Sequence, residues 1–211
     1  MSEQLIRLYV DAEYSSPYAM SAFVALHEKA LPFELCTLDF SARQQHAPSY
    51  AAKSLTRRVP TLEHGDFSLS ESSAICEYLE EVFPAVALYP QQLQQRARAR
   101  QVQAWLRSDL MALRNERNTM AVFYGKKFPP LSTAAVAAVE QLVYVADALL
   151  GEGAEHLFGQ WSIADTEMAL MLNRLHLHGD ALAPRLVRYA EAQWQRPSVQ
   201  RWLQYIAARS L

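Results

Sequence analysis

The sequence predicts two lobes, an α/β lobe followed by an all-α lobe. The chain has 211 residues, which is long for one domain and short for two large ones. Residues 1–84 alternate strand-like and helix-like patterns, whereas the remainder shows only helical patterns. The charge also changes near Pro90, because residues 1–90 carry 12 acidic and 6 basic side chains and residues 91–211 carry 10 and 14.

Composition narrows the class of protein. With 51% hydrophobic and 20% charged residues, the chain can bury a sizeable core. A net charge of -2 provides no basic track for nucleic acid. No apolar run reaches the roughly 18 residues that span a bilayer, and the N-terminus lacks a signal-peptide plan. We therefore expect a soluble, cytoplasmic protein that binds neither nucleic acid nor membrane, with its two cysteines, Cys36 and Cys76, as free thiols.

The first lobe opens with a predicted strand, helix and strand. Apolar residues alternate from Leu5 to Val10, which is typical of a strand. Ser15-Ser16-Pro17 then forms a helix start signal, an N-cap followed by proline at the first helical position. Leu31-Pro32 ends this helix, and residues 33–40 form a second apolar-rich strand. Two strands joined by a helix should be parallel.

The rest of the first lobe is predicted as a hairpin and a helix. A polar connection over residues 41–58 leads to short strands at Val59–Leu62 and Phe67–Ser70, whose link contains Gly65-Asp66. Residues 72–83 carry apolar side chains at helical spacing. The predicted order is β-α-β-β-β-α around a mixed sheet.

The second lobe is predicted as an all-α helical bundle without strands. Its longest helix is expected over residues 91–122, where Gln, Arg, Ala and Leu dominate. Further helices are expected over residues 133–150, from Ser162, over residues 184–195 and over residues 198–209. The predicted domains are residues 1–84 and 85–211.

Three segments of the first lobe carry chemical information. Ser16 places a hydroxyl at a helix N-terminus, where unpaired N–H groups and the helix dipole tolerate an anion such as a thiolate. Val59-Pro60 opens a strand with a residue that cannot donate to the sheet, which leaves the preceding backbone free to pair with an extended ligand. Glu71-Ser72 combines a carboxylate with a serine N-cap, which suits an α-amino acid headgroup. Helix capping alone remains the alternative for both serine segments.

In this order the three segments resemble the glutathione transferase family, whose fold is a thioredoxin-like domain followed by an all-α domain. The resemblance covers essentially the whole chain and is greatest to the serine-type branch and to bacterial transferases of the YfcF type. It rests on Ser-Pro-Tyr at residues 16–18, on Arg-Arg-Val-Pro at 57–60 and on Leu-Ser-Glu-Ser-Ser-Ala-Ile at 69–75.

The resemblance implies a role for each matching residue. Ser16 is expected to act on the glutathione thiol, and the Val59 backbone to pair with the cysteinyl part before a cis Pro60. Glu71 and Ser72 are expected at the γ-glutamyl end, and Arg58 near the glycyl carboxylate. Rivals for the thiol remain open, since tyrosine does this work in other branches: Tyr14 is the main one and Ser15 a lesser one.

In the second lobe the resemblance implies an acceptor pocket. The candidates lie on the first long helix, where an apolar or solvated helix face is the alternative: Trp105, Arg107, Asp109, Met111 and Arg114, with Tyr14 from the first lobe. Ser162 and Asp165 approximate a capping box with a folding role only. His176-x-His178 lies in a predicted helix, where residues two apart do not share a face, so no metal site is expected.

The expected function is transfer of glutathione to a small electrophile, with the thiol activated as a thiolate. Glutathione is the co-substrate, and no other cofactor is expected. Glutathione-dependent peroxide or disulfide reduction, and a non-catalytic interaction module of the same fold, remain alternatives. A homodimer is expected from the resemblance and from lobe charges of -6 and +4 that could pair across a two-fold axis.

Overall fold

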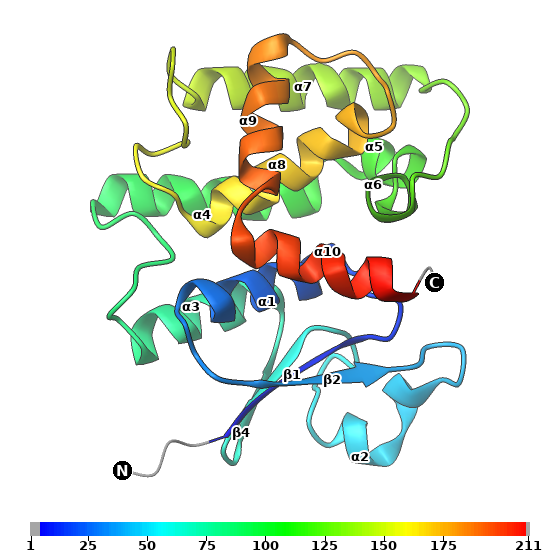
Figure 1. Cartoon of the computed structure of the whole chain (residues 1–211), viewed down its shortest axis with the longest axis vertical. Coiled ribbons are helices and arrows are strands. Elements are labelled where there is room, and N and C mark those ends of the chain that lie inside the picture. Colours follow the sequence, from blue (N-terminus) through cyan, green and yellow to red (C-terminus); the bar gives the residue numbers. More distant parts are fainter. Residues whose placement is uncertain (1–4, 210–211) are drawn as a thin grey trace. The chain divides into compact units, whose positions relative to one another are not determined.

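The computed structural model describes residues 5–209, which form two compact units (Figure 1). The first unit contains the described residues up to Leu88 together with Arg201–Arg209, and the second contains Tyr89–Gln200. Within the described part of the chain, no helix combines the length and apolar character needed to cross a bilayer.

The first unit is built on a four-stranded sheet in the order β2-β1-β3-β4. The strands are β1 (Ile6–Asp11), β2 (Glu34–Leu38), β3 (Thr61–His64) and β4 (Phe67–Ser70). β1 runs parallel to β2 and antiparallel to β3, and β3 and β4 form an antiparallel hairpin. The predicted mixed sheet, with its parallel and antiparallel halves, is confirmed.

Helices cover both faces of this sheet. α1 (Pro17–Glu28) and α3 (Ser72–Val82) lie on one face, and the short α2 (Pro48–Ala51) lies on the other (Figure 1). Leu8 and Val10 on β1 are fully buried, and the alternation of their strand matches a sheet with one apolar face. The predicted order β-α-β-β-β-α is confirmed, with bounds that differ from the predicted ones by a few residues at most.

The connection between β2 and β3 holds more structure than its polar sequence indicates. It contains a 3-10 turn, η1 (Gln44–His46), and α2. Tyr50 on α2 donates its hydroxyl to the Arg58 carbonyl at 2.6 Å and lies 2.9 Å from the Thr61 hydroxyl. This contact fixes the backbone on either side of Pro60 against the sheet.

The last helix, α10 (Pro197–Arg209), contributes its C-terminal part to the first unit. The buried Trp202 ring packs edge-on against Tyr14 and Phe23, with centroids 5.4 and 5.2 Å apart. Arg209 pairs with Glu13 at 2.8 Å. The units therefore differ from the predicted domains of residues 1–84 and 85–211, because these aromatic contacts join residues far apart in the sequence.

The second unit is a helical bundle with α8 (Ile163–His176) at its centre. All residues of α8 except Glu167 and His176 are buried, as expected for a helix surrounded by others. The other helices that lie wholly in this unit are α4 (Leu93–Ser108), α5 (Met111–Glu116), α6 (Thr119–Tyr124), α7 (Thr133–Leu149) and α9 (Pro184–Trp194). The predictions that correspond to α7, α8 and α9 are confirmed.

The single long helix predicted over residues 91–122 is wrong, since the chain forms α4, α5 and α6 instead. At the second break, the Arg117 carbonyl accepts from the Arg174 side chain at 2.7 Å rather than from a helical N–H group. Asn118 then caps α6 by accepting from the Met120 N–H group at 3.0 Å. A side chain from α8 therefore takes the place of the helical hydrogen bond.

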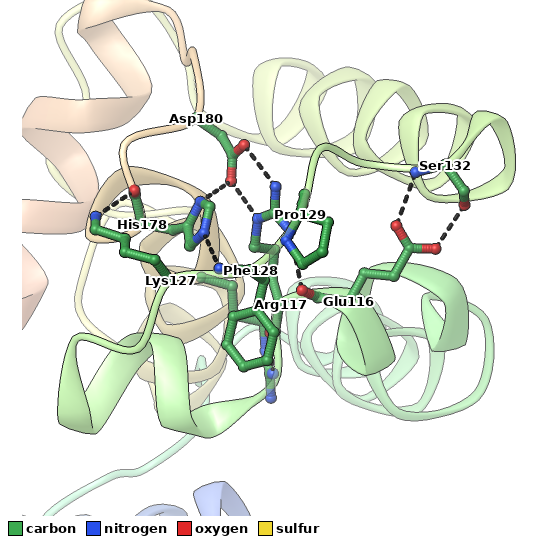
Figure 2. Close-up of polar contacts among 9 residues, drawn as sticks. Glu116, Arg117, Lys127, Phe128, Pro129, Ser132, His178 and Asp180 are labelled. Atoms are coloured by element: carbon green, nitrogen blue, oxygen red, sulfur yellow. Dashed lines mark hydrogen bonds and ion pairs between the residues drawn. The ribbon is translucent and has the colours of Figure 1, made fainter.

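A polar cluster surrounds the Arg117 side chain (Figure 2). Its guanidinium, 1% exposed, pairs with both oxygens of Asp180 at 2.6 and 2.9 Å and donates to the Pro129 carbonyl at 3.0 Å. These hydrogen bonds lower the pKa of Asp180. The cluster ties the segment after α6 to the segment after α8.

His178 belongs to the same cluster and lies outside the helix in which the sequence placed it, because α8 ends at His176. Its Nε2 accepts from the Phe128 N–H group at 2.9 Å, and its Nδ1 lies 2.9 Å from Asp180 (Figure 2). His178 thus bridges the two segments.

Candidate functional site

A cleft of about 630 Å³ opens in the first unit where four segments meet. They are the end of β1 with the start of α1, residues 40–46, residues 56–60, and the start of α3. The structure brings together all the residues that the sequence assigned to the thiol and the tripeptide. These are Ser16, Arg58, Val59, Pro60, Glu71 and Ser72.

Ser16 is the N-cap of α1, with the following proline at the first helical position, as predicted. Its backbone is extended (φ −78°, ψ 115°), and its hydroxyl oxygen accepts from the Ala19 N–H group at 3.2 Å. Among residues 5–209, no acceptor is recorded for the Ser16 hydroxyl proton. The Ser16 hydroxyl, which lines the cleft, can therefore donate a hydrogen bond to a ligand.

Ser15, the lesser rival, has its hydroxyl proton engaged. The hydroxyl donates to Asp11 Oδ2 at 2.8 Å, and the Ser15 N–H group donates to the same oxygen at 2.6 Å. Serving a ligand would require breaking the first of these bonds. The structure therefore favours Ser16 over Ser15 as the donor.

Tyr14, the main rival, packs away from the lining of the cleft. Its ring stacks on Tyr205 with centroids 5.1 Å apart and meets Trp202 edge-on. Burial, followed by the neighbouring Tyr205, raises the pKa of Tyr14. Tyr14 is not among the cleft residues, and its ring packs against α10 instead.

The peptide bond between Val59 and Pro60 is cis, as the resemblance implies. β3 begins only at Thr61, and the Arg58 carbonyl is occupied by Tyr50 and Thr61. Within the described chain, no hydrogen-bond partner is recorded for the Val59 backbone. An extended ligand could therefore pair with this backbone.

Glu71 and Ser72 form the corner where β4 turns into α3. Glu71 has a left-handed backbone (φ 78°) and is the N-cap, so the prediction that Ser72 is the N-cap is wrong: Ser72 is the first residue of the helix. The Glu71 side chain makes no capping hydrogen bond. A strained non-glycine residue at a ligand cleft is a common mark of function, because only the surrounding structure can hold it there.

Sequence reasoning missed several residues of the lining. Arg57 adds a second guanidinium beside Arg58, His46 adds an imidazole, and Asp11 adds a buried carboxylate. Adjacency to Arg58 in the Arg-Arg-Val-Pro motif could have indicated Arg57. No sequence signal indicates Asp11, since acidic residues are common at strand ends. The lining also includes Ser15, the lesser rival, and the residues that were not predicted for it: Pro17, Tyr18, Phe40, Gln45 and Thr56.

Two family models cover nearly the whole chain. The model of the glutathione S-transferase N-terminal domain matches residues 12–87, and that of the C-terminal domain matches residues 92–208. The chain belongs to the glutathione S-transferase family. Its first unit carries the thioredoxin-like fold of this family, and its second unit carries the helical bundle.

Curated relatives in the glutathione S-transferase family match part of the chain. Glutathione S-transferase theta-3 of Mus musculus is 35% identical over 130 residues, which is 59% of this chain and 53% of the relative. Glutathione S-transferase theta-1 of Homo sapiens is 32% identical over 138 residues, which is 63% of this chain and 57% of the relative. The matched region thus spans little more than half the length of these relatives.

Solved structures of glutathione transferases match the chain along its whole length. A homologue from Burkholderia gl BGR1, crystallised with bound glutathione, is 46% identical, with a TM-score of 0.79 over 97% of this chain and 99% of its own. A diazinon-metabolizing glutathione S-transferase from Bombyx mori is 19% identical, with a TM-score of 0.78 over 98% and 100%. At this identity, the second likeness shows the fold alone.

The residues predicted for the acceptor pocket are divided by the break between α4 and α5. Trp105 on α4 lines a separate groove of about 500 Å³ in the second unit, together with Tyr144 of α7. Asp109 is the C-cap of α4, and Met111 begins α5. Five candidates line neither this groove nor the cleft: Tyr14, Arg107, Asp109, Met111 and Arg114. Their role in binding an acceptor stays a prediction.

Other polar groups in the second unit have structural partners. Ser162 donates its N–H group to Asp165 at 2.8 Å, as expected for the capping box. His176 lies 3.1 Å from Glu191. Over residues 5–209, no group of three or more His, Cys, Asp or Glu side chains is placed to hold a metal ion.

Proposed function

We propose that this member of the glutathione S-transferase family binds reduced glutathione in the cleft of the first unit and transfers it to a small electrophile. One observation carries the proposal: three separate segments present a free hydroxyl proton at Ser16, unpaired backbone at Val59 and a carboxylate at Glu71 to one cavity. This is the set of groups that a thiol-bearing tripeptide requires.

The chemistry begins with the thiol. A free thiol has a pKa of about 8.5, so only a few per cent is ionised at neutral pH. A hydrogen bond from Ser16, together with the N-terminus of α1, favours the charged form and raises the thiolate population. The thiol proton passes to solvent, the sulfur forms a bond to the electrophilic carbon, and the leaving group departs with its electron pair.

The ends of the tripeptide meet groups of matching charge. Glu71, which lines the cleft, is assigned to the γ-glutamyl ammonium, and the N-terminus of α3 at Ser72 is assigned to the carboxylate beside it. The glycyl carboxylate is assigned to the cationic side of the cleft, where Arg58 and Arg57 lie. Glutathione bound to the Burkholderia homologue supports this ligand for a cleft of the same family.

Calorimetry with reduced glutathione, combined with a conjugation assay using a small aryl halide, tests the function. We expect saturable binding in the micromolar to millimolar range and glutathione-dependent conjugation. S-methylglutathione, which lacks the ionisable thiol, should bind without being consumed. Absence of glutathione binding by the folded protein would contradict the proposal. A homodimer stays a prediction, to be tested by the mass in solution.

A further inference from the structure

We infer that Asp11 is a positioning residue that selects Ser16, rather than Ser15, as the hydroxyl that serves the thiol. The inference rests on the proposed function, because it concerns the same thiol. Asp11 is the last residue of β1, lines the cleft and is 3% exposed. A buried carboxylate would repel the thiolate proposed for the same cavity, so the position of Asp11 needs a structural explanation.

The Asp11 side chain gathers three donors from the start of α1. Oδ2 accepts from the Ser15 N–H group at 2.6 Å and from the Ser15 hydroxyl at 2.8 Å, and Oδ1 accepts from the Ser16 N–H group at 3.1 Å. The turn between strand and helix also returns on itself, because the Tyr14 N–H group donates to the Asp11 carbonyl at 2.9 Å. Asp11 thus holds both serines from the buried side.

These bonds give the hydroxyl protons of Ser15 and Ser16 different roles. The Ser15 proton points at Asp11 and is used. The Ser16 oxygen accepts from Ala19, so its own proton is left to face the cleft, and its backbone is held by Oδ1 of Asp11. The next residue, Pro17, has no N–H group. Of the serine hydroxyl and N–H donors at this turn, only the Ser16 hydroxyl is therefore left for a ligand, and its position is fixed.

The direction in which the thiol pKa changes distinguishes a positioning role of Asp11 from a purely electrostatic one. A carboxylate near a thiolate disfavours the charged sulfur, so removal of the Asp11 charge alone would lower the thiol pKa. Loss of Ser16 positioning would raise it. Asparagine has nearly the same shape but only one acceptor oxygen, so in Asp11→Asn the amide NH₂ would meet one of the serine N–H donors.

Asp39 provides a matched control at the end of the neighbouring strand. Its carboxylate accepts from the Ser41 N–H group at 2.8 Å, the Ser41 hydroxyl at 2.6 Å and the Ala42 N–H group at 3.1 Å. The three donors are two N–H groups and one hydroxyl, as at Asp11, but all three reach one oxygen, Oδ1, so an asparagine can keep them. Asp39 is also exposed and is not among the cleft residues. Asp39→Asn repeats the chemical change away from the thiol.

The test is a double-mutant cycle on the pKa of the glutathione thiol bound to the full chain, followed by thiolate absorbance. We expect Asp11→Asn to raise this pKa, to lower kcat about tenfold and to change the glutathione Kd less than threefold, with Asp39→Asn unchanged. Because both residues act through one hydroxyl, Asp11→Asn combined with Ser16→Ala should be no worse than Ser16→Ala alone.

An unchanged or lowered thiol pKa in Asp11→Asn, or additive effects in the double variant, would overturn the inference while leaving the proposed function intact. Failure of the wild type to bind glutathione would overturn both. If Asp11→Asn does not fold, amide NMR on the wild type decides: the Ser15 and Ser16 amide protons should titrate together with one carboxyl group. Independent behaviour of these two amides would overturn the inference.

Discussion

Two regions of the molecule are each built around one carboxylate: Asp11 in the cleft of the first unit and Asp180 in the Arg117 cluster of the second unit. The two carboxylates differ in whether the groups that they bind have further partners in the protein. In the Arg117 cluster, Asp180 meets a guanidinium and an imidazole that both have further protein partners (Figure 2). In the cleft, Asp11 meets two serines, and one hydroxyl proton is left over beside unpaired backbone.

The difference indicates what each region is for. A polar cluster whose groups bond mainly to one another fixes two segments and has little to gain from a ligand. A cleft with unmet donors and acceptors gains hydrogen bonds when a ligand of matching chemistry arrives. The comparison makes separate predictions, because stability should depend on the Arg117 cluster and glutathione chemistry on the cleft.

The largest expected effect is on stability. Arg117→Met should lower the free energy of unfolding by about 3 to 5 kcal/mol, because it leaves Asp180 and the Pro129 carbonyl without their buried donor. Arg185→Met, at an exposed pair with Asp147, should cost at most about 1 kcal/mol. Urea unfolding of both variants checks this. Equal losses would show that the cluster is no more important than a surface pair.

The next effect is on glutathione affinity. Glu71→Gln removes the charge assigned to the γ-glutamyl ammonium, and charge-assisted hydrogen bonds are worth about 1.5 to 3 kcal/mol. Calorimetry should show affinity reduced roughly tenfold or more. The melting temperature without ligand should stay close to that of the wild type, since the side chain makes no capping bond. Unchanged affinity would remove Glu71 from the site.

The Arg117 cluster should also weaken in acid. Hydrogen bonds from Arg117 lower the pKa of Asp180, so the folded state holds the ionised form more strongly than the unfolded state does. The resulting stability is present above the unfolded pKa of about 3.9 and is lost as pH falls through the lower folded value. The stability gap between wild type and Asp180→Asn should therefore shrink below about pH 4. A gap that widens there would contradict the assignment.

The smallest effects are expected at the two rivals of Ser16. Tyr14→Phe keeps the ring contacts with Tyr205 and Trp202, and Ser15→Ala keeps the Ser15 N–H bond to Asp11. Turnover should stay within about threefold of the wild type for both. A loss of turnover in Tyr14→Phe as large as that in Ser16→Ala would move the chemistry to tyrosine.

The sequence predicted the parts of this molecule that depend on local pattern. The alternation in β1, the Ser-Pro start of α1 and the Gly-Asp hairpin are signals of neighbouring residues, and all three elements formed as predicted. The six residues expected at the thiol and the tripeptide meet in one cleft. The segments that carry them follow β1, precede β3 and follow β4, and β1, β3 and β4 are neighbours in the sheet.

The parts that failed depend on partners far away in the sequence. The second break in the helix predicted over residues 91–122 lies at Arg117, whose partners Arg174 and Asp180 come from α8 and the segment after it. The last helix joins the first unit through Trp202, which no local pattern indicates. Asp11 was missed for a different reason: its partners Ser15 and Ser16 are only four and five residues further along the chain, but no sequence pattern shows that the turn brings their donors back to its carboxylate.

The central claim is that Ser16 stabilises a thiolate in the cleft, and the pKa of bound glutathione in Ser16→Ala tests it most directly. Glutathione affinity should be nearly unchanged, because Val59, Glu71 and Ser72 hold the tripeptide, while the thiol pKa should rise towards about 8.5 and turnover should fall sharply. Loss of the N-cap costs about 1 kcal/mol, so Ser16→Gly serves as the milder control for folding. A folded Ser16→Ala protein that keeps the wild-type thiol pKa would contradict the account.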